Sequence, residues 1–403
     1  MAFLSTDVFR HRQEALGELM REHDLDAIAI ATPDNFLFFT NYFLDVAPWE
    51  RPVLAVYPRS GAPFAVMHEL STNGIRMARE RGTLWLDDVT LYGEHPRLSG
   101  RLPLLPQWPA LVAGLLREHG LRRGSIGTDA ASAGLVQAVE GLGGGRLVPM
   151  EKDLRPLRWV KTSEEQVLLR QAAALSDWGQ ERYRENLRVG RQVQELDFFT
   201  ASQLAEEAGS RVPGEHVECR VMSVRGPDSA APHGTGAPTG ARIQAGDGIV
   251  NIIIVRLNGL VVENERTWLF GAPSPTQEEA FEVARRAQEA AIGQMVAGNP
   301  VFSIDAAALE VIERAGYGDR VVHRTGHGVG TAGHEFPDDT AFNDRALLAG
   351  EVFSAEPGVY VYGLGGFRHD DTVIVGADAP ELLTRAPKDL ARQTIAVGAP
   401  SLR

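Results

Sequence analysis

The chain carries, at residues 323–337, the sequence HRTGHGVGTAGHEFP. This stretch sets His327 and His334 seven residues apart in a glycine-rich segment, where backbone and ligand can approach each other closely. Two later segments, Ala355-Glu356-Pro357-Gly358 and the run that contains Asp370, each supply a carboxylate after an apolar stretch. Histidine combined with separated carboxylates is typical of a metal-assisted or carboxylate-driven hydrolase.

The composition is that of a globular protein with more than one core. The chain has 403 residues, more than one hydrophobic core usually supports, so we expect two domains. Its 44% hydrophobic and 23% charged residues are ordinary for globular proteins. A net charge of −13 argues against nucleic acid as a partner, because binding to phosphates requires clustered Lys and Arg.

The cysteine content and hydropathy indicate the compartment. Cys219 is the one cysteine, which excludes an intrachain disulfide, fits a reducing compartment and is interpreted as a core residue. The first residues lack a basic region followed by an apolar core, so no signal peptide is expected. No run of about 18 apolar residues suggests a membrane span. A cytoplasmic location follows.

Hydrophobic patterning predicts an α/β domain followed by an α+β domain. Residues 9–23 have helical spacing, and residues 26–31 and 53–57 read as buried strands. Thr162-Ser163-Glu164-Glu165 is typical of a helix start. The predicted domains are residues 1–155 and 156–403, the second with strands over about 215–270, helices over about 276–297 and 303–316, and site-bearing strands and loops over about 321–376.

One hairpin can be predicted in register. Asn258-Gly259 lies between two β-rich runs and favours a two-residue turn. In that register Leu257 faces Leu260, Ile254 faces Glu263, and Ile252 faces Glu265, while Asn251 points to the other side of the sheet. Two glutamates then project from an aliphatic surface, where a carboxylate is costly unless it pairs with a cation or shares a proton. A solvated strand face is the alternative for these glutamates.

These segments together resemble the creatinase/aminopeptidase, or pita-bread, family, which includes Xaa-Pro aminopeptidases and prolidases. The resemblance covers nearly the whole chain and rests on motifs in family order: residues 226–234, Gly326-His327-Gly328, His334–Pro337, Glu356-Pro357-Gly358 and Arg368 with Asp371-Thr372-Val373. It implies a creatinase-like N-terminal α/β domain, an α+β pita-bread catalytic domain, C–N bond hydrolysis of a short peptide or small molecule, and a homodimer.

The resemblance also implies roles for individual residues. In the metal-dependent members, two ions held by two Asp, one His and two Glu generate the attacking hydroxide. By that resemblance His327 is a metal ligand, Glu356 is a ligand and acid/base, and His334 and His233 are catalytic histidines beside the substrate. Arg368 is expected to bind substrate.

Three positions depart from the family pattern. The first aspartate of the hairpin, eleven residues before Glu263, falls on Ile252, which cannot ligate a metal. Glu263 replaces the second aspartate, and Asp370 replaces the last glutamate, although Asp370 could instead pair with Arg368 on the same strand. The incomplete set of Glu263, His327, Glu356 and Asp370 predicts at most one divalent ion (Mn, Zn or Co), or none.

Two other functions remain open. In a metal-independent, creatinase- or ectoine-hydrolase-like enzyme for a small cationic or zwitterionic substrate, His233 would move the proton while Glu265 and Glu356 held the substrate. An inactive relative used for binding is the third hypothesis, which the retention of His233, His334 and Glu356 disfavours. His323 and His369 are interpreted as structural.

Overall fold

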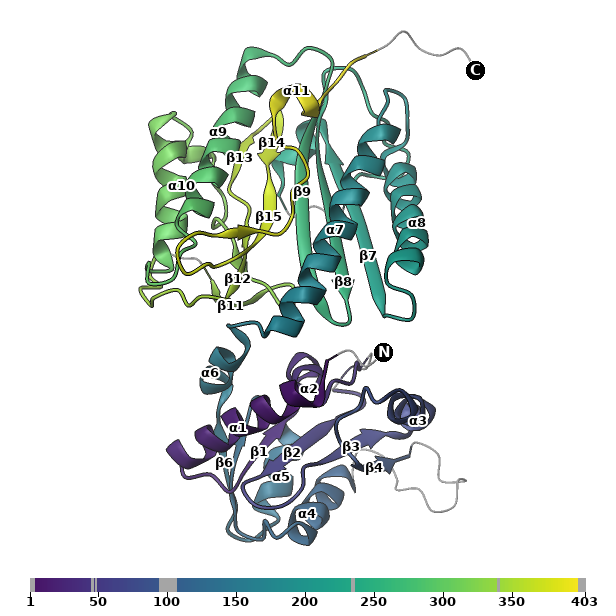
Figure 1. Cartoon of the computed structure of the whole chain (residues 1–403), viewed down its shortest axis with the longest axis vertical. Coiled ribbons are helices and arrows are strands. Elements are labelled where there is room, and N and C mark those ends of the chain that lie inside the picture. Colours follow the sequence, from purple (N-terminus) through teal and green to yellow (C-terminus); the bar gives the residue numbers. More distant parts are fainter. Residues whose placement is uncertain are drawn as a thin grey trace. The chain divides into compact units, whose positions relative to one another are not determined.

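The computed structural model describes residues 4–44, 47, 49–93, 107–232, 236–338 and 341–397, and of 336–338 only the backbone. The chain forms two compact units, Met1–Arg158 and Trp159–Arg403 (Figure 1). His233, one of the predicted catalytic histidines, lies outside the described residues. Every described helix is too short or too polar to span a bilayer.

The first unit is an α/β domain, as predicted. Its six strands are ordered β4-β3-β2-β1-β5-β6, with β1 antiparallel to β2 and parallel to β5. The strands are β1 Ala27–Ile30, β2 Leu54–Pro58, β3 Phe64–His68, β4 Asp88–Tyr92, β5 Ser125–Thr128 and β6 Arg146–Pro149. The helices are α1 Thr6–Glu22, α2 Pro33–Thr40, α3 Thr72–Arg81, α4 Trp108–Glu118, α5 Ala133–Glu140 and the short α6 Glu151–Leu154.

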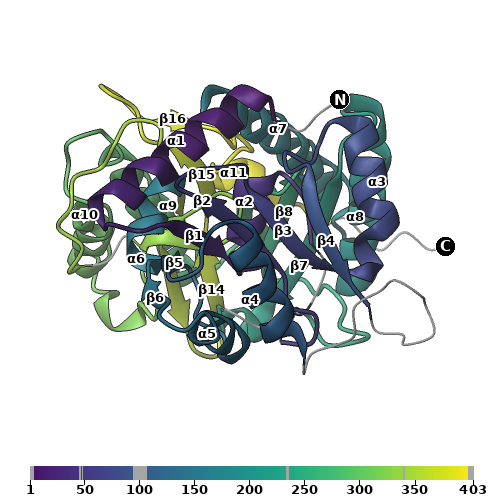
Figure 2. The ribbon, with the colours of Figure 1, turned by 90° about the horizontal axis from the view of Figure 1, so that it is seen from below.

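Both faces of this sheet are covered. Strand alternation sends Ile28 and Ile30 toward α1, α2 and α3, and sends Ala27 and Ala29 toward α4 and α5. The two helical layers are visible in the view from below (Figure 2). Because each strand is buried on both sides, β1 consists of apolar residues alone, which is why the sequence pattern identified it.

The second unit is built on a nine-stranded sheet within the described residues. Its main path is β11-β10-β12-β15-β9-β8-β7, with β16 on β15 and β17 on β9. The strands are β7 Val217–Arg225, β8 Gly248–Leu257, β9 Leu260–Phe270, β10 His327–Gly328, β11 Glu335–Asp338, β12 Val352–Ala355, β15 Asp370–Ile374, β16 Glu381–Leu382 and β17 Thr394–Ile395. A separate hairpin pairs β13 Gly358–Val361 with β14 Gly365–Arg368.

Two helix pairs pack on this unit (Figure 1). Helix α7 (Ser163–Asn186) starts with a capping box between Thr162 and Glu165, and lies with α8 (Val193–Arg211) along β7, β8 and β9. Helices α9 (Pro275–Gly293) and α10 (Phe302–Arg314) enclose a second core with β12 and β15. The predicted helices are therefore confirmed to within a few residues; the short α11 (Leu390–Gln393) was not predicted.

The β8–β9 hairpin has the predicted register. Leu257 pairs with Leu260, Ile254 with Glu263, and Ile252 with Glu265. Asn258 and Gly259 have φ of 50° and 91°, and positive φ at both residues is what this tight turn requires.

The two faces of the hairpin have different partners. Asn251 and Ile253 point toward α7 and α8, where Asn251 Nδ2 donates to Ser223 Oγ at 3.1 Å. Cys219 packs against the same core but is only half-buried, so the interpretation as a core residue holds in part. The opposite face of the hairpin, with Ile252, Ile254, Glu263 and Glu265, forms the floor of the candidate site.

Candidate active site

A cavity of about 200 Å³ lies over the hairpin face that carries the two glutamates. Residues from five segments of the second unit converge on it: Arg220, Met222, Pro232, Ile252, Ile254, Glu263, Glu265, His327, His334, Glu356 and Arg368. It therefore gathers all the predicted site residues that the structure describes except Asp370, which lies behind the lining. Asp370 pairs with Glu265 across β15 and β9, and its carboxylate is completely buried.

His327 is held in a fixed orientation between two carboxylates. Its backbone N–H donates to Ser354 Oγ at 3.0 Å, and its Nδ1 lies 3.1 Å from the carbonyl of Gly328. Since a carbonyl only accepts, Nδ1 carries the proton and Nε2 faces the cavity. Nε2 is 3.5 Å from Glu263 Oε2 and 3.5 Å from Glu356 Oε1.

The surroundings of His327 favour a positive charge at Nε2. Burial disfavours the imidazolium, but the hydrogen bond to Glu263 and the charges of Glu263 and Glu356 outweigh it and raise the pKa of His327 to about 9. The same geometry presents a buried nitrogen and two carboxylates to any cation that replaces the proton.

His334 is a neutral donor stacked on His327. The two imidazole rings are 3.6 Å apart and nearly parallel. Nδ1 of His334 lies 3.2 Å from Arg324 Nη2, and because a guanidinium only donates, Nδ1 accepts. The ring proton therefore lies on Nε2.

Three carboxylates form the other side of the site. Glu265, Glu356 and Asp370 each offer an oxygen within 4.8 Å of the others. Arg368 binds Glu265 with two guanidinium nitrogens, one of them 2.9 Å from Oε1, and its Nη1 is 3.8 Å from Glu356 Oε2. Asp370 Oδ1 accepts from the N–H of Ala355 at 3.1 Å, whereas Oδ2 is buried with no hydrogen-bond partner among the described residues.

This crowding retains protons on carboxylates. Burial, reinforced by Glu356 and Glu263 and opposed by Arg368, raises the pKa of Glu265 to about 8. Burial and repulsion from Glu265, Glu356 and Glu263 raise the pKa of Asp370 well above its usual range. Burial disfavours a charged Arg368, yet the neighbouring carboxylates raise the pKa of its guanidinium further. The cluster of carboxylates therefore favours a nearby positive charge.

The possible pairing of Arg368 with Asp370 is wrong. The alternative assumed one continuous strand, but β14 ends at Arg368 and β15 begins at Asp370. His369 lies at this break, is completely buried against the edge of the Phe281 ring, and has a pKa lowered well below its usual value by burial and the charges of Arg266, Lys388 and Arg285. The break allows Arg368 to reach Glu265, and His369 does not line the cavity.

Arg220 and Met222, which line the cavity from β7, were not predicted. Near the site, Tyr360 Oη lies 3.3 Å from Arg368 Nη1 and 2.7 Å from His323 Nε2. A buried ion pair joins Lys161 Nζ to Glu335 Oε2 at 3.1 Å, next to His334 in the chain. Arg220 and Met222 alternate along the chain as residues on one face of a strand do. No turn motif sets the register of β7 against β8, so their position beside the site could not be predicted from the sequence.

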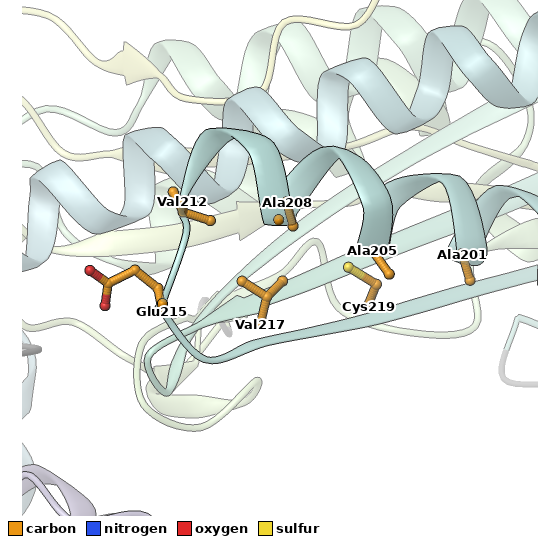
Figure 3. A pocket seen from close by; sticks show the side chains of 9 residues that line it. Ala201, Ala205, Ala208, Val212, Glu215, Val217 and Cys219 are labelled. Atoms are coloured by element: carbon orange, nitrogen blue, oxygen red, sulfur yellow. The ribbon is translucent and has the colours of Figure 1, made fainter. Parts of the chain in front are cut away.

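A second cavity lies between α8 and β7 and has no comparable chemistry (Figure 3). It measures about 310 Å³ and is lined by Ala201, Ala205, Ala208, Gly209, Val212, Gly214, Glu215, Val217 and Cys219. Burial raises the pKa of the Cys219 thiol to about 11, so the thiol is not an activated nucleophile.

The comparisons with known proteins agree with this geometry. The Creatinase/Prolidase N-terminal domain matches residues 12–160, and Metallopeptidase family M24 matches residues 167–377. The putative dipeptidase YkvY of Bacillus subtilis is 29% identical over 94% of this chain and 99% of its own, and the Xaa-Pro dipeptidase of Lactobacillus helveticus is 28% identical over 94% and 97%.

The solved structures include one that aligns with almost all of the chain. The crystal structure of dipeptidase PepE from Mycobacterium ulcerans superposes with a TM-score of 0.80 at 27% identity, covering 98% of this chain and 100% of that one. With both domain models matched in order and His327 set among carboxylates in the cavity, the chain belongs to metallopeptidase family M24.

Proposed function

We propose that this chain hydrolyses the amide bond of dipeptides of the Xaa-Pro type. The observation that carries the proposal is the position of His327 Nε2, 3.5 Å from both Glu263 and Glu356 inside a small cavity. Membership of family M24 and similarity to a putative dipeptidase and an Xaa-Pro dipeptidase support the same reaction.

The donor atoms fit one divalent ion. Nε2 of His327 is buried, and carboxylate oxygens of Glu263 and Glu356 each lie 3.5 Å from it. One nitrogen with carboxylate oxygens suits Zn²⁺, Mn²⁺ or Co²⁺. Bound there, such an ion would polarise a carbonyl and lower the pKa of a water molecule.

The donor atoms do not fit a second ion of the family type. Ile252 occupies the position from which a carboxylate would reach it, and an aliphatic side chain cannot ligate. Glu265, directly opposite, already binds the guanidinium of Arg368 with both oxygens. We therefore propose a site for one ion, with Arg368 as the fixed positive charge on its other side.

The remaining chemistry is assigned to the protein's own groups. Glu356, between His327 and Arg368, is the carboxylate that would take a proton from attacking water. His334, neutral with its proton on Nε2, would donate a hydrogen bond to the substrate amide. Arg368 would hold the negative charge that develops on the carbonyl oxygen.

The metal-independent alternative is less well supported. It requires Glu265 to hold a cationic substrate group, yet that carboxylate is bound by Arg368. A substrate cation would have to displace a guanidinium whose Nη1 also contacts Tyr360 Oη at 3.3 Å. We therefore place this reaction second.

Metal analysis combined with an activity assay tests the proposal. Protein purified without chelator is expected to hold about one equivalent of divalent metal and to hydrolyse Xaa-Pro dipeptides, with activity lost on chelation and restored by Mn²⁺, Co²⁺ or Zn²⁺. His327→Ala should lose both metal and activity, while His11→Ala, at an exposed position of α1, should keep both. Activity that survives with well under one equivalent of metal would favour the metal-independent reaction. No hydrolysis by metal-loaded protein would refute the function.

We also propose a cytoplasmic homodimer. The single cysteine supports a reducing compartment, and Phe198 and Phe199, adjacent and exposed at 73% and 41% on α8, support an interface between subunits. Light scattering on a sizing column and fractionation of cells test the two statements. A monomer at micromolar concentration would contradict the first, and recovery outside the cytoplasm the second.

A further inference from the structure

Arg220 is a cation at the cavity that forms no ion pair with the described part of the chain. It lies on β7, the last strand of the sheet path, and its side chain is exposed at the cavity. Its Nη2 lies 3.3 Å from the sulfur of Met222, and no described carboxylate forms an ion pair with it. Arg368, the other arginine of the lining, is by contrast bound to Glu265.

The strand register places this charge opposite the acidic group. Arg220 pairs with Ile254, and Ile254 pairs with Glu263, so the three form one row across β7, β8 and β9. Neighbouring strands lie about 4.8 Å apart, which puts the backbones of Arg220 and Glu263 about 10 Å apart. The cavity therefore has a positive end on the edge strand and a negative end at the centre of the sheet.

The floor between the two charged ends is apolar. Met222 pairs with Ile252 in the next row, which continues to Glu265, and together with Ile254 these side chains separate Arg220 from the carboxylates. No polar group of this floor competes for either end of a substrate. The ligand that matches the two charged ends and the apolar floor of the cavity is a short zwitterion with an aliphatic middle.

We propose that Arg220 binds the free carboxylate of the substrate and thereby limits the enzyme to dipeptides. The inference rests on the proposed function. A dipeptide spans at most about 7 Å, so with its amine at the acidic group its carboxylate is within reach of the long Arg220 side chain. A guanidinium recognises a carboxylate through two parallel hydrogen bonds. Each residue added to the substrate moves its carboxylate by about 3.5 Å, past the position at which it contacts Arg220.

A comparison of acid and amide substrates tests the assignment on the metal-loaded enzyme. Wild type should hydrolyse a dipeptide with a free carboxylate about 10–100-fold more efficiently than the same dipeptide with a C-terminal amide, the effect of one charged hydrogen-bonded contact. Arg220→Ala should lose about the same factor in kcat/KM on the free acid, mainly through KM, and change little on the amide. Arg220→Lys should fall between them, because it keeps the charge without the bidentate geometry.

The matched control is Arg286→Ala, an exposed arginine on α9 that does not line the cavity, which should keep the wild-type preference. Equal turnover of acid and amide by wild type, or an equal loss on both in Arg220→Ala, would overturn the inference while leaving the dipeptidase function intact. If wild type turns over neither, calorimetric binding of the same two dipeptides decides. Tighter binding of the acid that Arg220→Ala abolishes supports the role of Arg220 even though the proposed reaction fails, and equal binding overturns it.

Discussion

Ile252 and Glu265 face each other on β8 and β9, so the carboxylate at this level of the sheet comes from β9 rather than from β8. Glu265 is only 4% exposed, and Arg368 compensates its charge. The sheet therefore keeps an acidic group close to the place where the family pattern has one, but attaches it to a different strand and binds it to an internal cation.

Replacing Ile252 by aspartate should make stability depend on metal. A further carboxylate opposite Glu265 adds repulsion to a group that already retains protons, so Ile252→Asp should unfold at a lower temperature than wild type without metal. Addition of Mn²⁺ or Zn²⁺ should raise the unfolding temperature of Ile252→Asp by more than that of wild type, because an ion that binds the folded state stabilises it. Thermal unfolding with and without metal measures this. Ile252→Asn is the control, and an equal metal response of the two variants would contradict the prediction.

Gly326→Ala should destabilise the protein by disturbing the strand of His327. A Cβ at position 326 would lie 2.2 Å from the carbonyl oxygen of Ser354, whose hydroxyl also accepts the hydrogen bond from the His327 N–H. Backbone atoms must then shift, at a cost of about 1–3 kcal/mol. Gly293→Ala, at a helical position where a Cβ meets nothing within 4 Å, should instead be neutral or gain up to about 1 kcal/mol. Urea unfolding measures both, and equal stabilities of the two variants would contradict this account.

The buried pair of Lys161 and Glu335 should contribute to both stability and catalysis. Lys161→Met removes the cation beside a carboxylate that is 4% exposed in its side chain, which should cost about 3–5 kcal/mol. The neighbouring residue is His334, so kcat should fall as well. Removing the exposed partner Arg314 from its pair with Glu310 should change stability by less than about 0.5 kcal/mol. If Lys161→Met and Arg314→Ala unfold at the same urea concentration, the pair does not have this role.

Protonation of Asp197 should stabilise the folded protein in mild acid, an effect that the Asp197→Asn variant lacks. Burial raises its pKa to about 6, against the hydrogen bonds from Ser223. Because the folded pKa lies above the unfolded one, the protonated form favours folding. That contribution is complete below about pH 4 and is lost as the pH rises through about 6. The free energy of unfolding of wild type minus that of Asp197→Asn should therefore fall by about 1–3 kcal/mol across this range. A flat difference would contradict the shifted pKa.

The sequence predicted those parts of the fold that local chemistry determines. The Asn258-Gly259 turn set the β8–β9 register, because a turn with two positive φ angles permits one alignment. The capping box at Thr162 set the start of α7. The shared face of Glu263 and Glu265 follows from that register and was therefore predictable from local sequence.

The rest of the site depends on contacts between distant segments. The register of β7 on β8 is set across a long connection, so Arg220 was not predicted as a site residue. The break at His369 turns Arg368 toward Glu265, and no residue pattern marks it beforehand. Asp370, predicted as a ligand, is not among the residues that line the cavity; its Oδ1 accepts from the Ala355 backbone, and its carboxylate lies within 4.8 Å of Glu265 and Glu356.

In the row of Arg220, Ile254 and Glu263, the spacing of the strands sets the length of substrate that fits between the two charged side chains. The distance between the backbones of Arg220 and Glu263 equals two strand spacings. Hydrogen bonds hold each spacing at about 4.8 Å, whatever side chains the strands carry. Exchanging Ile254 for another aliphatic residue should leave the measured substrate length unchanged. Moving the arginine from β7 to position 254 would shorten that length by one strand. Selectivity for chain length would then be separable from the catalytic groups and open to redesign on its own.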